Sequence, residues 1–198
     1  DGALVNGELM RPYHTSRVVK PAELVDKATG SPFASFLLRR EIVVKLPDYY
    51  VDCPVGDRPL ELMAADYGDS YYFDEPMSVY RFGIRGSWTE NQMNGDYVEK
   101  QQKYAADMWK MYHRFDAETG GRFHEACEHA GRRVEFLTAV NTRNFELIYR
   151  PENADFLQEL SRHDRFFIDF EHRFPKLYHG LRRLKSGAPK QIEEKESV

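Results

Sequence analysis

The sequence predicts an α/β protein that is rich in helix, with a few short strands in its first 90 residues and a helical C-terminal extension. Two observations carry this prediction. Prolines and turn residues divide the first zone into short apolar and aromatic runs, which is typical of mixed short elements. Between Pro76 and Pro151 there is no proline, and apolar residues recur three or four positions apart, which indicates long amphipathic helices. We therefore expect three parts: an α/β unit at 1–89, a helical extension at 90–185 and a disordered tail at 186–198.

Short elements of the first zone follow from local signals. Residues 59–67 read as a helix, because Pro59 is tolerated in a first turn, the apolar residues fall on one face and Gly68 can end it. The aromatic and β-branched runs at 70–74 and 77–82 predict two strands, separated by a Glu-Pro pair.

The second zone predicts a pair of antiparallel helices. One apolar stripe runs from Tyr97 to Phe115, and a second begins at Phe123 after Gly120 and Gly121, with a break near Asn141. Three shorter helices are then expected at 152–162, 164–174 and 175–185.

Composition narrows the class of protein. The 198 residues are 41% hydrophobic, enough for a core, and 28 Lys or Arg against 32 Asp or Glu give a net charge of −4. A chain this close to neutral is not a general binder of nucleic acid. Its apolar runs are shorter than the roughly 20 residues that span a bilayer. Cys53 and Cys127 form no CxxC or Cys/His cluster, so neither a zinc module nor a disulfide scaffold is indicated, and a cytoplasmic setting suits them.

The segment PVGDRP at 54–59 places an acid, Asp57, at the start of the expected helix. A carboxylate there receives the helix's unpaired N–H groups and its positive end, which favours the ionised form. Two interpretations stay open on this pattern alone: a plain N-cap, which is the more frequent role for such an acid, and a functional carboxylate.

Four motifs in order resemble the second half of bacterial family 2 glycosyltransferases of the GT-A fold. They are HTSR at 14–17, FASFLLRREI at 33–42, PVGDRPLELMAADYG at 54–68 and YYFDEPMSVYRFGIRGSW at 71–88. The match covers nearly half of the chain, and the combination of the Gly-Asp helix start with the Asp-Glu-x-Met-Ser-Val-Tyr-Arg strand is fairly specific. The resemblance implies that 1–89 is the acceptor-side half of a GT-A domain.

The resemblance implies that Asp57 is the general base, which takes a proton from the acceptor hydroxyl. A sugar is then transferred from a nucleotide-diphosphate donor with inversion of its anomeric configuration. The implied acceptor is a glycan or a lipid-linked molecule, as in cell-envelope polysaccharide synthesis. Many members carry an acid before this Asp, where this chain has Gly56. The donor and a divalent metal, Mn or Mg, belong to an N-terminal half with an Asp-x-Asp motif that this sequence lacks, so we expect this chain alone to bind no metal and to be inactive.

Further residues are candidates for binding the acceptor or the donor phosphates. His14 and Arg17 would border the cleft, with a solvated loop as the alternative, and Arg58 directly follows the predicted base. A second group could bind a phosphate through guanidinium forks and a sugar through an aromatic face: Tyr80, Arg81, Arg85 and Trp88. The alternative for this group is a strand-end arginine paired with Asp74 or Glu75.

The stretch HEACEH at 124–129 is not a zinc motif. Its histidines are five positions apart, about 140° around a helix, whereas an H-E-x-x-H site needs them four apart. An exposed polar face is the better interpretation.

The last expected helix, at 174–185, is basic and amphipathic. It could contact an anionic membrane surface peripherally, or dock on protein, which we favour because aromatic residues pack equally well there. The function that competes with a glycosyltransferase is a non-catalytic binding or oligomerisation module, which would use the helical pair and this helix and could form a homo-oligomer.

Overall fold

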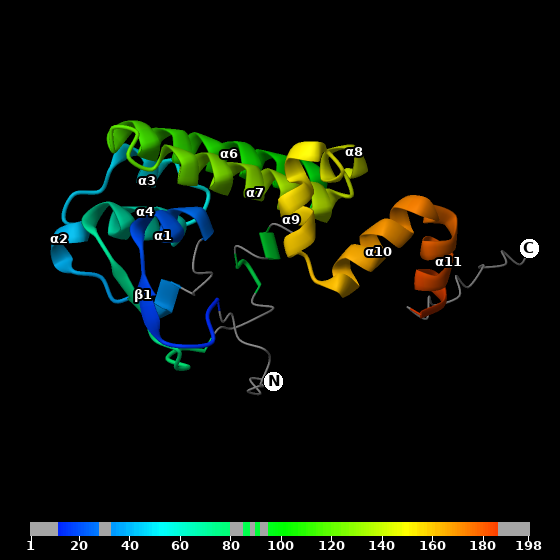
Figure 1. Cartoon of the computed structure of the whole chain (residues 1–198), viewed down its shortest axis with the longest axis horizontal. Coiled ribbons are helices and arrows are strands. Elements are labelled where there is room, and N and C mark those ends of the chain that lie inside the picture. The colour runs from blue at the N-terminus through cyan, green and yellow to red at the C-terminus, as the bar shows by residue number, and fades with distance from the viewer. Residues whose placement is uncertain (1–11, 28–32, 80–84, 88–89, 92–94, 186–198) are drawn as a thin grey trace, which may run out of the picture. The chain divides into compact units, whose positions relative to one another are not determined.

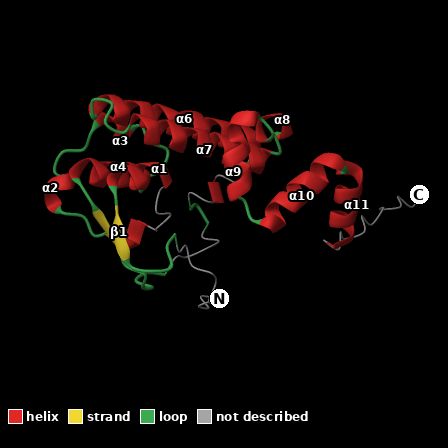
Figure 2. Ribbon diagram, in the orientation of Figure 1, coloured by secondary structure: helices red, strands yellow, loops and turns green. Residues whose placement is uncertain are grey.

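The computed structural model describes residues 12–27, 33–79, 85–87, 90–91 and 95–185 (Figure 1). The chain divides into two compact units, Asp1–Thr142 and Arg143–Val198. Helix dominates the described residues, in which the strands form one two-stranded sheet (Figure 2). This confirms the coarse prediction of a helix-rich chain with short strands only near its start.

The sheet pairs β1 (Arg17–Val19) with β2 (Ser70–Tyr72) in antiparallel register, Arg17 opposite Tyr72 and Val19 opposite Ser70. The first part of the strand predicted at 70–74 is therefore confirmed. The strand predicted at 77–82 is wrong over 77–79, which are neither helix nor strand, and 80–82 lie outside the described residues. The Glu-Pro pair before it removes a backbone donor, and within the described sheet β1 pairs with β2 alone.

Four short helices complete the first part of unit 1: α1 (Pro21–Lys27), α2 (Arg40–Val43), α3 (Asp48–Val51) and α4 (Arg58–Tyr67), with a 3-10 turn at Phe33–Ser35. Helix α4 confirms the prediction for 59–67 to within one residue. At its end, the Gly68 N–H donates to the Ala64 carbonyl over 3.0 Å.

The long helices α6 (Tyr97–Glu118) and α7 (His124–Thr142) run side by side, as predicted (Figure 1). Gly120 and Gly121 reverse the chain between them with φ values of 66° and 78°, which favour glycine. Gly131 of α7 lies against Trp109 of α6 so closely that a Cβ would stand 2.6 Å from the indole.

The helical pair shares one core with the first part of the chain. Val25, Leu62 and Phe115 are fully buried in this core, which α1, α4, α6 and α7 build together. The compact unit thus extends to Thr142, whereas composition suggested a division near residue 89.

Unit 2 consists of α8 (Phe145–Ile148), a 3-10 turn (Pro151–Asn153), α9 (Ala154–Glu159), α10 (Arg162–Arg173) and α11 (Pro175–Lys185). It begins at Arg143, whose φ of 58° interrupts the helical path close to the predicted break. Three helices lie where they are predicted. The first is shorter than predicted, because a 3-10 turn precedes it and it ends at Glu159; α10 begins two residues early, and α11 has the predicted bounds. The tail predicted at 186–198 lies outside the described residues.

Candidate functional site at the start of helix α4

Asp57 closes the loop before α4 and is half-buried. The N–H groups of the first helical turn need few acceptors, because Pro59 has no N–H. Leu60 and Glu61 both donate to the Asp57 carbonyl, over 3.1 and 3.2 Å. The remaining one, the Arg58 N–H, donates to Asp57 Oδ1 over 2.9 Å. The cap therefore uses a single carboxylate oxygen. Among the described residues the Asp57 carboxylate accepts this one hydrogen bond and enters no ion pair.

Arg58 points into the core, where its side chain is 5% exposed. Its Nε donates to Tyr112 Oη over 2.9 Å, and its Nη1 donates to the Leu24 carbonyl and to Glu61 Oε2, each over 2.8 Å. Its Nη2 donates to the Val25 carbonyl. The prediction that Arg58 binds a ligand phosphate is therefore corrected: its guanidinium is buried and joins α4 to α1 and α6.

Charge balance keeps Arg58 protonated. Burial alone would lower the pKa of Arg58, but Tyr112 and Glu61 outweigh it and raise this pKa above its ordinary value. The Arg58–Glu61 pair, on one helix three residues apart, is thus a neutralised buried ion pair.

The charge of Asp57 contributes to the raised pKa of both Cys53 and Tyr104. Burial, the largest cause, raises the pKa of Cys53 to about 11 and that of Tyr104 to about 12. The thiol and the phenol are therefore neutral at physiological pH. Among the described residues, Asp57 is not part of a buried ion pair.

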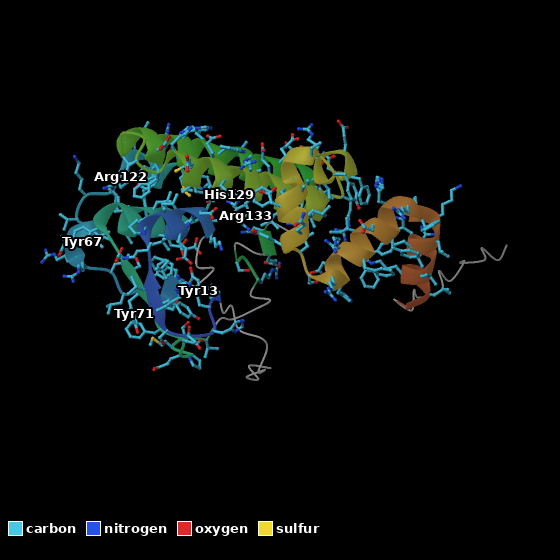
Figure 3. All side chains as sticks on the ribbon, viewed as in Figure 1. Tyr13, Tyr67, Tyr71, Arg122, His129 and Arg133 are labelled. Atoms are coloured by element: carbon cyan, nitrogen blue, oxygen red, sulfur yellow. The ribbon has the colours of Figure 1, made fainter. Side chains whose placement is uncertain are left out.

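Helix α4 is also fixed at its other end. Arg122, from the turn before α7, donates to the Asp66 carbonyl over 3.1 Å and pairs with the Asp66 carboxylate. Tyr67 Oη donates to Glu41 of α2 over 2.7 Å. Figure 3 labels Arg122 and Tyr67 among the side chains. The helix that presents Asp57 is thus anchored along its length.

Arg17 lies on β1 and is held by local partners. Its guanidinium donates to Glu23 over 2.8 Å and stands over the Tyr13 ring, 4.7 Å from the centroid. Tyr13 Oη donates to the same carboxylate over 3.1 Å. Arg17 is half-exposed. Among the described residues, no hydrogen bond or ion pair joins Arg17 to Asp57.

Of the other predicted binding residues, the structure describes His14 and Arg85. His14 is exposed just before β1, and Arg85 is exposed in a turn. Tyr80, Arg81 and Trp88 lie outside the described residues. The predicted phosphate and sugar contacts of this group therefore stay predictions.

The two histidines of the HEACEH stretch have separate carboxylate partners. His124 Nδ1 lies 2.8 Å from Asp116 Oδ2, while His129 Nδ1 contacts Asp26. The hydrogen bond to Asp116 is the largest cause that raises the pKa of His124. Within the described part of the chain, no group of three His, Cys, Asp or Glu side chains is placed to hold a metal ion.

Sequence reasoning missed Glu61 and Tyr112 as partners of Arg58. The i,i+3 spacing of Arg58 and Glu61 could have indicated the ion pair. The apolar stripe indicates only a core position for Tyr112. Its hydroxyl accepts from Arg58, which lies 54 positions away in the sequence.

In comparisons with known proteins, no protein-family model, no curated protein and no solved structure matches the chain.

Proposed function

We propose that this chain is the acceptor-side and C-terminal portion of an inverting family 2 glycosyltransferase with a GT-A-like domain, in which Asp57 is the general base. The observation that carries the proposal is the carboxylate at the start of α4, which caps the helix through one oxygen and is not neutralised by a side-chain cation among the described residues. A helix N-terminus stabilises such an ionised base.

The chemistry needs only a positioned carboxylate from this chain. Asp57 Oδ2 takes the proton of the acceptor hydroxyl as that oxygen forms a bond to the anomeric carbon of the donor sugar. The bond from this carbon to the diphosphate breaks on the opposite face, and its electron pair leaves with the nucleoside diphosphate. Attack opposite the leaving group inverts the configuration.

Contacts among the four motifs support the proposal. The Asp74 N–H donates to Ser16 Oγ over 2.9 Å, which ties the motif at 14–17 to the motif at 71–88. The Tyr67–Glu41 hydrogen bond ties the motif at 33–42 to the motif at 54–68. Segments that resemble one enzyme half thus pack against one another in unit 1.

A divalent metal remains an expectation for a complete enzyme. The described residues do not fit one, because no suitable cluster of ligands lies among them.

The test is Asp57→Asn in the gene product extended upstream of Asp1, assayed by release of nucleoside diphosphate from a panel of sugar nucleotides. Asn keeps the helix cap but cannot take the proton, so we expect kcat to fall by about 10²- to 10⁴-fold with the donor KM little changed. Asp69→Asn is the matched control, since Asp69 is exposed and paired with Lys20. Unchanged turnover by Asp57→Asn would refute the base assignment.

A second candidate is a non-catalytic binding or oligomerisation module. It is favoured by α11, where Leu177, Leu181 and Leu184 are at least half-exposed. A catalytic role for Asp57 distinguishes the two candidates, because a binding module would tolerate Asp57→Asn.

A further inference from the structure

Helices α10 and α11 form a hairpin joined by aromatic side chains. Phe166, Phe170 and Phe174 follow one another along α10 and its end, with ring centroids 6.0 and 5.8 Å apart. Tyr178 of α11 lies 6.2 Å from Phe170 and 6.5 Å from Phe167. These contacts fix α11 against α10.

The hairpin leaves large apolar side chains in solvent. Leu177, Leu181 and Leu184 project from α11 with exposed fractions of 54%, 51% and 81%. Phe166 and Phe174 are 60% and 54% exposed. The three leucines fall on one side of the helix because they are spaced four and three positions apart. Unit 2 therefore presents an apolar surface that its residues up to Lys185 do not cover.

Positive charge accompanies this surface. Residues 162–184 carry six Lys or Arg against three Asp or Glu, although the whole chain has a net charge of −4. The three acids all lie on α10, where Asp169 accepts from Tyr149 Oη over 2.6 Å and Glu171 pairs with Arg143 over 2.9 Å. Helix α11 has no acidic residue and carries exposed Lys176 and Arg182.

We propose that the α10–α11 hairpin docks on an anionic lipid bilayer, with the apolar side chains of α11 inserted and its lysine and arginine side chains at the headgroups. A helix with leucines on one face and basic residues on the other lies in the plane of such an interface, buried by about 5–10 Å. Single projecting leucines suit a fluid acyl layer, because a bilayer needs no preformed cavities to receive them. The absence of acids from α11 removes the repulsion that an anionic surface would otherwise impose.

The size of the effect can be anticipated. Each Lys or Arg near an anionic surface strengthens binding by about fivefold. Burial of the exposed half of a leucine contributes a similar factor, about fivefold. Reversing two charges or removing two leucines should each weaken vesicle binding by at least about tenfold.

The test is co-sedimentation of the 198-residue chain with vesicles. Phosphatidylcholine alone is compared with an equal mixture of phosphatidylcholine and phosphatidylglycerol, at low and high salt. We expect binding to the anionic vesicles, weakened by salt and at least about tenfold weaker on neutral ones. Leu177→Ser/Leu181→Ser and Lys176→Glu/Arg182→Glu should each lose binding.

Matched controls come from unit 1, where Leu37 is 96% exposed and Arg40 and Lys45 are exposed. Leu37→Ser and Arg40→Glu/Lys45→Glu should bind like the parent chain. Circular dichroism checks that every variant keeps its helix content. Equal binding to neutral and anionic vesicles, or undiminished binding by both α11 variants, would overturn the proposal. So would an absence of vesicle binding together with a dimer that Leu177→Ser/Leu181→Ser dissociates, which would identify a second copy as the occupant.

Discussion

Helices α4 and α11 have similar sequence patterns, but most of α4 is buried whereas the leucines of α11 are exposed. They have 10 and 11 residues, and each has a proline in its first turn and apolar residues three or four positions apart. Seven residues of α4 are buried, including a charged pair, whereas the leucines of α11 are at least half-exposed. The difference shows that an amphipathic pattern specifies a helix but not what covers it. Residues that are distant in the sequence decide what covers a helix, and for α4 these residues belong to α1 and α6.

The largest stability effect is expected at the buried charge of α4. Arg58→Met leaves Glu61, Tyr112 and two carbonyls without their donor, so we expect a loss of about 3–5 kcal/mol in the free energy of unfolding, measured with urea. Arg40→Met, at an exposed position, should change it by less than about 0.5 kcal/mol.

The double variant Arg58→Met/Glu61→Leu tests the same buried ion pair with both charges removed. Replacing both charges by apolar groups also removes the carboxylate that has lost its Arg58 donor, so we expect much of the loss to be recovered. A double variant no more stable than Arg58→Met would contradict the account of α4 as a helix held by a neutralised pair.

Leucine truncation compares the two helices directly. Leu62→Ala in α4 removes a side chain with 0% exposure and should cost about 2–5 kcal/mol. Leu181→Ala in α11, where 51% of the side chain is exposed, should cost less than about 1 kcal/mol. Similar losses at both positions in urea titrations would mean that α11 is covered in solution.

High pH should destabilise unit 1. Burial raises the pKa of Cys127 from 9.0 to about 12, so its stabilising contribution is complete below pH 9 and is lost as pH rises toward 12, because the unfolded thiol ionises first. The loss is at most about 1.4 kcal/mol per pH unit for this group. Urea midpoints should fall over this range, and less steeply in Cys127→Ala. A parallel fall in both proteins would exclude the thiol as a contributor.

The smallest effect is expected at the cap. Asp57→Ala should cost about 1 kcal/mol of unfolding free energy, while Asp57→Asn should be nearly neutral, because asparagine caps helices about as well as aspartate. Thermal melts of the two variants distinguish these values. A large loss in Asp57→Asn would mean that the carboxylate is structural.

Local signals predicted α4 and the turn between α6 and α7, because Pro59, Gly68, Gly120 and Gly121 act on the chain next to them. They could not predict β1, a strand of three residues, or the inward direction of Arg58, whose partner Tyr112 is 54 positions away. The same limit applies to the candidate site. Sequence placed Asp57 at a helix start, but only the fold shows that its neighbour Arg58 is committed to the core.

We propose that this chain supplies the acceptor side and the base but not the donor site. Calorimetric titration with nucleoside diphosphates and Mn²⁺ or Mg²⁺ tests it on the 198-residue chain and on the gene product extended upstream. We expect that only the extended protein binds the nucleoside diphosphates. Binding by the 198-residue chain itself, or by neither protein, would contradict it.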